Sequence, residues 1–271
     1  MKYFNKVILV VLAITGIFEL NYTCAQIKYT KLVWSDEFNQ SGLPDSAKWG
    51  YDAGRGCPQN CGWGNNELQY YTVSRKENAR VENGHLIIEA HRENFQSSNY
   101  TSARLVTKEK GHWKYGRIEV RAKLPSGNGM WPAIWMLPAH SKYGNWPHSG
   151  EIDIVEYVGY IPDSLYATVH TGAYNGMINT QKGGRTYRND LHSEFHVYSS
   201  IWTEDSISFF IDGEKYFSFR NDQKGSAVWP FDQAFYLILN IAVGGNWGGK
   251  KGVDNLIFPQ RMEVDYVRVY Q

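Results

Sequence analysis

Short apolar runs separated by glycine-rich turns recur along this chain, and they constrain its fold more than any other feature. Alternation of apolar and polar residues is typical of half-buried strands, and a nearly continuous apolar run indicates a central buried strand. Asn83-Gly84 and Asp212-Gly213 are strong hairpin signals between such runs. No segment has the pattern of an amphipathic helix of three turns, so we predict an all-β sandwich, barrel or jelly roll. The expected strands span residues 86–90, 117–121, 206–211 and the apolar run 235–242.

The length and charge of the chain narrow its class further. Its 271 residues fit one all-β domain, and neither a repeat nor a long linker divides them. The formal net charge of +1 comes without a basic patch, so nucleic acid is not an expected partner. The 19 Tyr and 10 Trp suit strands, and they also suit a sugar-binding cleft, because the apolar face of a pyranose ring stacks on Trp. Both interpretations hold together.

The first residues have the pattern of a secretion signal. Lys2 and Lys6 supply a positive start, and residues 7–18 form a mostly apolar run that is too short to span a bilayer comfortably. Small residues then favour cleavage after Ala25. We therefore expect a secreted or periplasmic protein with no membrane segment after cleavage.

This cleavage would divide the chain into a signal peptide, residues 1–25, and a single domain, residues 26–271. A lipoprotein anchor on Cys24 is the alternative. Residues 21–23 (NYT) fit that alternative poorly.

Two cysteines remain after cleavage, Cys57 and Cys61, and an even number suits an oxidising compartment. They enclose the loop-like sequence CPQNC, which a local disulfide can close. Metal binding is the alternative, but two ligands do not complete a zinc site. We predict the disulfide.

Three acidic residues alternate with β-branched residues in the sequence GEIDIVEY, residues 150–157. In a strand, Glu151 and Asp153 point to the same face, because side chains repeat every two residues. Glu156 follows Glu151 by five positions, so a regular strand turns it to the opposite face. A one-residue bulge at Ile154-Val155 brings it back, and all three carboxyl groups then line one surface.

Three carboxyl groups on one face repel each other, so some must be protonated or bound to a partner. A calcium site is one interpretation, but calcium loops carry Asp, Asn and Gly on flexible backbone, whereas this segment is typical of a rigid strand. A solvated acidic face is another, and the Trp-rich sequence before the segment weakens it. The third interpretation is a hydrolytic site. Retaining glycosidases place two carboxyl groups roughly 5–5.5 Å apart, and nearby positions on one strand face can reach this separation. In such a pair, one carboxylate attacks the anomeric carbon and the other carboxyl group protonates the leaving oxygen. Asp153, between the two glutamates, would hydrogen-bond the attacking carboxylate and, through its charge, help to keep Glu156 protonated.

The motif Glu151-x-Asp153-x-x-Glu156 resembles the catalytic signature of glycoside hydrolase family 16, in the variant with the extra bulge residue. The flanking segments look like laminarinases, the endo-β-1,3-glucanases, and the resemblance covers residues 32–271. It implies a β-jelly-roll of two stacked antiparallel sheets, with the substrate cleft on the concave face. The matching segments are 63–72 (WGNNELQYYT), 115–125 (YGRIEVRAKLP), 129–138 (GMWPAIWMLP) and 265–271 (DYVRVYQ).

The resemblance also implies roles for single residues. Glu151 is the expected nucleophile, Asp153 the assisting acid and Glu156 the general acid/base. His170 matches a family histidine near the acid/base, and a core histidine bonded to backbone is its alternative. A plain core position is likewise the alternative for any one of the tryptophans. The residues expected to contact substrate are the stacking Trp131, Trp135 and Trp146, and the hydroxyl-binding Asn65, Arg104 and Asn240.

Many members of this family hold a structural calcium far from the cleft. The matching positions are Glu37 and Gly84, through backbone carbonyls, and Asp265. Such an ion would stabilise the fold. No cofactor is expected for catalysis.

The expected function is hydrolysis of β-1,3-glucan by double displacement, carried out by a monomer on a polysaccharide or oligosaccharide. Relatives cut mixed-linkage β-1,3-1,4-glucans or red-algal galactans; the mixed-linkage specialists typically lack the bulge residue, and the galactan enzymes usually lack a segment like 63–72. A non-catalytic glucan-binding protein on the same fold is a further alternative, although such relatives tend to lose the glutamates that are present here. Transglycosylation stays open, because a sugar can outcompete water at the intermediate.

Overall fold

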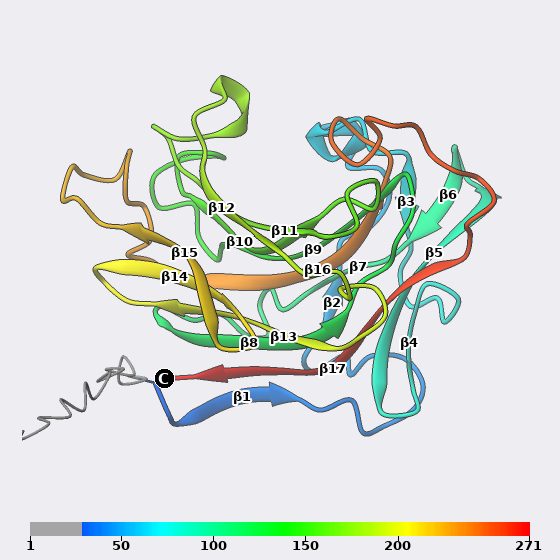
Figure 1. Ribbon diagram of the computed structural model, residues 1–271, viewed down its shortest axis with the longest axis horizontal. Coiled ribbons are helices and arrows are strands. Elements are labelled where there is room, and N and C mark those ends of the chain that lie inside the picture. The colour runs from blue at the N-terminus through cyan, green and yellow to red at the C-terminus, as the bar shows by residue number, and fades with distance from the viewer. Residues whose placement is uncertain (1–28) are drawn as a thin grey trace, which may run out of the picture.

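Two stacked β-sheets form the framework of the computed structural model, which describes residues 29–271 (Figure 1). The predicted signal peptide and Cys24 lie outside the described residues. Within residues 29–271, no helix is long and apolar enough to cross a membrane. The predicted sandwich of two sheets is confirmed.

The first sheet has ten strands. Neighbouring strands in this sheet are antiparallel, with one exception: β3 and β6 are parallel. This pair differs from the expected all-antiparallel arrangement. A parallel pair needs a long connection, and here the chain between the two strands makes a complete hairpin first. The order is β15-β14-β13-β8-β17-β5-β6-β3, with β1 on β17 and β4 on β5. The strands are β1 (Leu32–Asp36), β3 (Gln69–Tyr71), β4 (Ala79–Glu82), β5 (His85–Phe95), β6 (Ser98–Ser102), β8 (Gly116–Lys123), β13 (His196–Trp202), β14 (Ser206–Ile211), β15 (Glu214–Arg220) and β17 (Gln260–Tyr270).

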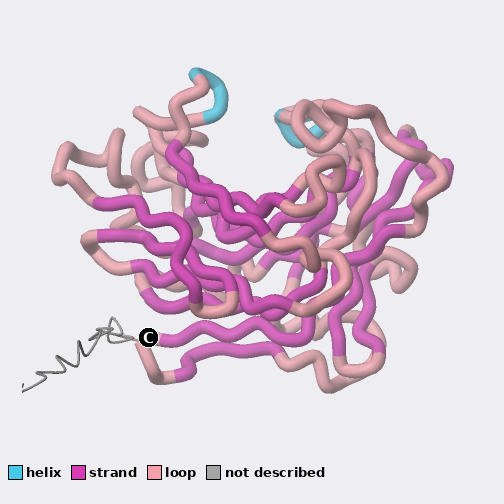
Figure 2. The backbone as a smooth tube through the Cα atoms, viewed as in Figure 1, coloured by secondary structure: helices cyan, strands magenta, loops and turns pink. Residues whose placement is uncertain are grey.

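The second sheet has seven strands and a concave outer face. Its order is β12-β11-β10-β9-β16-β7-β2. Figure 2 shows two short 3-10 helices, η1 (Cys61–Gly64) and η2 (Gly176–Ile178), on loops that rise at opposite rims of this face. The strands are β2 (Gly50–Tyr51), β7 (Arg104–Val106), β9 (Met130–Pro138), β10 (Glu151–Tyr157), β11 (Ser164–His170), β12 (Lys182–Tyr187) and β16 (Phe235–Val243).

Strand β16 contributes side chains to both faces of the seven-stranded sheet. Every residue of the strand is buried, as the continuous apolar run predicts. Its odd-numbered side chains, such as Leu237 and Leu239, join the main core between the sheets. Ile238 and Tyr236 instead pack with Val106 in a separate cluster, to which Trp135 adds its ring. Alternate residues point to opposite faces of a strand, so this second cluster lies on the concave face.

Both predicted hairpins are confirmed. Asn83-Gly84 joins β4 to β5, with φ of 52° and 77°, and Asp212-Gly213 joins β14 to β15, with φ of 49° and 81°. Two consecutive residues with positive φ define the turn that matches the twist of paired strands. The predicted disulfide between Cys57 and Cys61 is also present.

Candidate active site

Strand β10 carries the three acidic residues, and its pairing is irregular where the sequence predicts a bulge. On the β9 side, Asp153 pairs with Trp135 and Val155 pairs with Ile134, so Ile154 is the extra residue. On the β11 side the register also shifts between Asp153 and Glu156. The bulge prediction is therefore confirmed.

The side chains of β10 point to the two faces of the sheet as the bulge predicts. Ile152, Ile154 and Val155 are all buried in the main core. Glu151, Asp153 and Glu156 interact electrostatically with one another, which places their carboxyl groups close together on the concave face. The spacing of five residues thus brings the two glutamates to one surface.

Two ring nitrogens approach Glu151. Trp146, on the loop before β10, donates its indole N–H to Glu151 Oε2 at 2.9 Å, and its own side chain is 42% exposed. His170 Nε2 lies 3.7 Å from Glu151 Oε1 and 3.5 Å from Asp153 Oδ2. The His170 and Trp146 rings are adjacent, with centroids 5.8 Å apart. Both predicted residues therefore lie beside the expected nucleophile.

A backbone contact sets the tautomer of His170. The Gly176 N–H, at the start of η2, donates to His170 Nδ1 at 3.2 Å. Nδ1 is then the acceptor, and the proton of the neutral ring resides on Nε2, which faces Glu151 and Asp153. Burial lowers the pKa of His170, which favours this neutral form. Glu151, Asp153 and His170 have the geometry of a metal-binding group, but a protonated Nε2 offers a metal no lone pair.

Glu156 has different neighbours. Thr168 Oγ1 donates to Glu156 Oε2 at 2.9 Å from the adjacent strand β11. The Trp131 side chain provides a further hydrogen bond that favours the ionised carboxylate. Both donors hold the carboxyl group in place without neutralising it.

Burial raises the pKa of all three carboxyl groups. The pKa of Glu151 rises to about 7, against the opposing effects of the Trp146 N–H and the Arg104 charge. The pKa of Asp153 rises well above its usual range, through burial and then the charges of Glu151 and Glu156. Asp153 is 3% exposed and its Oδ2 has no hydrogen-bond partner within residues 29–271. We conclude that Asp153 holds a proton that it shares with Glu151, and that burial favours the protonated form of Glu156.

These raised pKa values make the fold less stable as the pH rises, and Glu151→Gln tests this. The pKa of Glu151 moves from 4.5 to about 7 on folding. Folded protein therefore binds more protons than unfolded protein in that window, and the free energy of unfolding falls as the pH passes through it. Gln does not titrate, so at pH 8 the variant should be more stable than the wild type by up to about 3 kcal/mol. Urea unfolding at pH 8 and pH 4 measures the difference.

At pH 4 the advantage of Glu151→Gln should shrink, because Glu151 is then protonated in the folded wild type. Glu204→Gln, at an exposed position, serves as the control and should show no such pH-dependent gain. A Glu151→Gln variant that is equally stable relative to the wild type at both pH values would contradict the pKa assignment.

Arg104 lies on the concave face beside the acids. Its guanidinium stacks between the rings of Trp63, at 4.5 Å, and Trp135, at 4.7 Å, and its Nε lies 3.0 Å from Asp52 Oδ2. Its charge acts on Glu151, whose ionised form it favours. Arg104 therefore covers one face of Trp135, which is not available to a sugar.

Asn240 is tied into a buried network. Its Oδ1 accepts from Trp135 Nε1 at 2.7 Å, and its Nδ2 donates to Tyr71 Oη at 3.0 Å. Tyr71 in turn donates to Glu67 Oε2 at 3.4 Å. Because Asn240 is 5% exposed and both ends of its amide are engaged, its place in the structure is to orient Trp135. Its predicted hydroxyl contact stays a prediction.

Asn65 lies at the opposite rim from η2. It directly follows η1, and its carbonyl oxygen accepts from the Asn246 N–H at 2.7 Å. The Cys57–Cys61 disulfide closes the turn before η1, and η1 carries Trp63. Trp131 and Trp135 lie on one face of β9, as their spacing predicts, since they pair with Ala242 and Ile238 on β16.

One aromatic residue was missed in the sequence. Trp247, in the loop between β16 and β17, contacts the ring of Trp131 at 5.6 Å and the ring of Tyr166 at 5.1 Å. The sequence GGNWGG around Trp247 was the available signal. Gly248 permits the contact, because a Cβ atom there would approach Trp131 Cβ to 2.7 Å.

The positions expected to hold calcium have other partners for their carboxylates. Asp265 Oδ2 accepts from Arg121 at 2.6 Å, and Glu37 accepts from Arg268 at 2.9 and 2.8 Å. Two guanidinium groups therefore supply positive charge beside these carboxylates. Calcium ligation by the backbone of Glu37 and Gly84 and by Asp265 stays a prediction.

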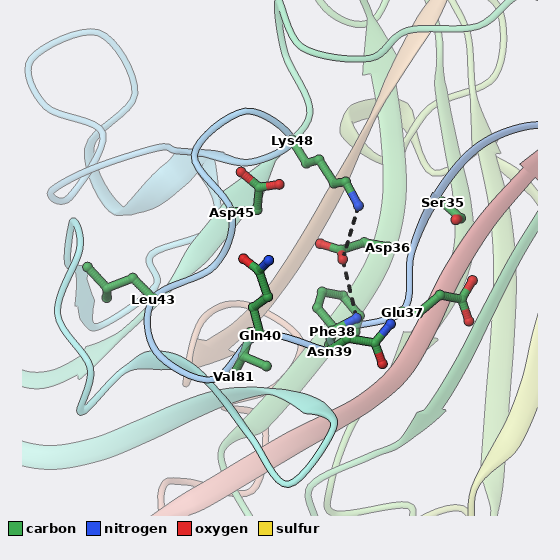
Figure 3. A pocket seen from close by; sticks show the side chains of 10 residues that line it. All are labelled: Ser35, Asp36, Glu37, Phe38, Asn39, Gln40, Leu43, Asp45, Lys48 and Val81. Atoms are coloured by element: carbon green, nitrogen blue, oxygen red, sulfur yellow. Dashed lines mark hydrogen bonds and ion pairs between the residues drawn. The ribbon is translucent and has the colours of Figure 1, made fainter.

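A pocket of about 280 Å³ lies next to Glu37, at the end of β1 (Figure 3). Its buried acid, Asp36, accepts from Trp49 Nε1 at 2.8 Å and from Lys48 Nζ at 3.3 Å. This acid is fully engaged within the fold. The pocket includes none of the residues of the concave face.

The chain is similar to proteins of known family and structure. A model of glycosyl hydrolases family 16 matches residues 66–268. The beta-glucanase of Rhodothermus marinus is 54% identical over 248 residues, which cover 89% of this chain and 85% of that protein. The X-ray structure of the laminarinase from Rhodothermus marinus matches with a TM-score of 0.86 at 55% identity, covering 89% of this chain and 97% of that chain. SCLam, a non-specific endo-β-1,3(4)-glucanase, matches with a TM-score of 0.84 at 52% identity, covering 89% and 91%.

Proposed function

The chain belongs to glycosyl hydrolases family 16, and we propose that it is an endo-β-1,3-glucanase that retains the configuration of the anomeric carbon. The observation that carries this proposal is the bulge at Ile154. It brings Glu156 to the face that carries Glu151 and Asp153, and a retaining glycosidase needs two carboxyl groups on one face.

In the first step, the ionised Glu151 attacks the anomeric carbon and forms an ester bond to it. The glycosidic C–O bond breaks, and Glu156 gives its proton to the departing sugar oxygen. Glu151 is suited to this role because Trp146 and Asp153 both donate hydrogen bonds to it. Glu156 is suited to donate a proton because burial raises its pKa.

In the second step, Glu156, now ionised, takes a proton from a water molecule. The water oxygen bonds to the anomeric carbon while the ester to Glu151 breaks. Asp153 keeps its proton throughout and hydrogen-bonds Glu151, which limits the charge in this buried group. Neutral His170 adds an N–H that faces the same carboxyl groups.

The proposed substrate is β-1,3-glucan, as for the laminarinase among the relatives. Cleavage of mixed-linkage β-1,3-1,4-glucan is the second candidate, favoured by the likeness to SCLam, a non-specific endo-β-1,3(4)-glucanase. A purely glucan-binding role is disfavoured because Glu151 and Glu156 are both present and their carboxyl groups interact on one face. Secretion, a monomeric state and a structural calcium are further proposals that rest on the sequence.

Product analysis tests the reaction and the substrate together. We expect laminarin to be cleaved fastest, lichenan more slowly and agarose not at all. Proton NMR of the first product should show the β configuration at the new reducing end, because two displacements at one carbon restore it. An α product formed first would contradict the nucleophilic role of Glu151, and faster cleavage of lichenan would move the substrate to mixed-linkage glucan.

A further inference from the structure

The extra residue of the β10 bulge has a partner from the other sheet. A bulge leaves the extra residue unpaired and disturbs the ladder around it. The carbonyl oxygen of Ile154 accepts a hydrogen bond from Tyr216 Oη at 3.4 Å. Tyr216 lies on β15, in the ten-stranded sheet, so this bond crosses from one sheet to the other.

Tyr216 is itself the extra residue of a second bulge. On β14, Phe209 pairs with Phe217 and the next residue, Phe210, pairs with Lys215, so no residue of β14 opposes Tyr216. A bulge re-aims a side chain that would otherwise follow the regular alternation. The Tyr216 ring packs against the main core, while its neighbour Lys215 is exposed. The second bulge thus directs the Tyr216 hydroxyl towards the first.

The Tyr216 hydroxyl also lies near Glu156. Burial raises the pKa of Tyr216, and the charge of Glu156 raises it further. Tyr157 and Tyr198 are buried in the same core, but their hydroxyl groups have no hydrogen-bond partner within residues 29–271. Of these three tyrosines in contact with the core, Tyr216 alone has its hydroxyl bonded to the bulge.

We propose that the Tyr216 hydroxyl fixes the β10 bulge and is thereby a positioning residue for the proton transfer by Glu156. Ile154 precedes Glu156 by two residues, so the orientation of the Ile154 peptide determines where the Glu156 backbone and side chain lie. Without the hydroxyl, the bulge keeps its two apolar residues in the core but loses a bond that selects one peptide orientation. This inference rests on the proposed retaining mechanism.

Tyr216→Phe tests the proposal, because it removes the hydroxyl and keeps the ring that packs in the core. We expect kcat on laminarin to fall about 5- to 20-fold, the size of a lost hydrogen bond acting on a general acid, with KM nearly unchanged. On a dinitrophenyl β-laminaribioside, whose leaving group needs no proton, kcat/KM should fall less than about twofold. The alkaline limb of the pH profile on laminarin should also shift.

Tyr198→Phe is the matched control, since it removes a buried hydroxyl from the same core without touching the bulge. It should leave both substrates and the pH profile within about twofold of the wild type. An equal loss on both substrates by Tyr216→Phe would indicate a purely structural role and overturn the proposal. The same holds if Tyr216→Phe has no effect, or if Tyr198→Phe reproduces its effect.

The two failures are distinguishable. Wild-type protein that does not cleave laminarin contradicts the proposed substrate only, and the comparison then uses the glucan that it does cleave. The loss of activity of Tyr216→Phe on that glucan is then compared with its loss on a dinitrophenyl glycoside of the same sugar linkage. The difference between the two losses still reports on proton transfer by Glu156.

Discussion

Glu151→Ala should lower kcat on laminarin by a factor on the order of 10⁴ or more, because it removes the group that forms the covalent intermediate. The fold should survive the change. Glu151 sits on the concave face rather than in the main core, and its loss relieves a buried group of carboxyls. Steady-state kinetics on laminarin, with circular dichroism as the check on folding, gives the result.

Azide separates this role from a general loss of structure. In Glu151→Ala, azide can enter the space of the missing carboxylate and attack the anomeric carbon once, while Glu156 still protonates the leaving oxygen. The product should then be an α-glycosyl azide, the result of a single inversion. Glu204→Ala, an exposed acid away from the concave face, should keep full activity. Near-normal turnover by Glu151→Ala would remove Glu151 from the mechanism.

The central part of the site could be predicted from sequence because it depends on a local rule. Side chains on a strand alternate with a period of two, so two acids five residues apart can share a face only across an extra residue. The flanking apolar residues had to remain in the core, which fixed the extra residue to Ile154 or Val155. The pairing with β9 then identifies Ile154. The same local reasoning predicts the hairpins at Asn83-Gly84 and Asp212-Gly213.

The contacts between distant segments could not be predicted in this way. Arg104 stacks between Trp63 and Trp135. The three residues come from separate parts of the chain, and no local sequence pattern encodes their contact. Tyr216 appears in the sequence as one aromatic residue of an ordinary strand. Its role depends on a bulge in β15 and on the packing of one sheet against the other, which a single strand pattern does not contain.

Predicted contact residues also differ in how the structure uses them. Trp146 is exposed and donates a hydrogen bond to Glu151, the expected nucleophile. This position suits a direct contact with a sugar. Asn240 was expected to bind a hydroxyl group of the substrate, and the structure bonds its amide to Trp135 and Tyr71. Its substrate contact stays a prediction, because residue type does not reveal which partners a polar side chain has within the fold.

Glu156→Ala should produce a different pattern of loss from Glu151→Ala. Removing the general acid/base should lower kcat on laminarin by about 10²- to 10⁴-fold, because the leaving sugar is then expelled without a proton. A dinitrophenyl β-laminaribioside should still form the glycosyl-enzyme at close to the normal rate, since its leaving group needs no proton. Hydrolysis of that intermediate becomes slow, because no base activates the water. A burst of dinitrophenolate followed by a slow steady state should be observed.

Azide again identifies the residue, with the opposite stereochemistry. It needs no base, so it should attack the intermediate of Glu156→Ala, accelerate the slow phase and give a β-glycosyl azide through two inversions. The glutamates of β10 would then be assigned by the product that each variant yields: α from Glu151→Ala and β from Glu156→Ala. Should Glu156→Ala give the α-azide, or lose both substrates equally without rescue, the two roles would have to be exchanged or abandoned. Because Glu156 faces the cleft only by virtue of the extra residue, the β-azide would also tie the chemistry to the bulge at Ile154.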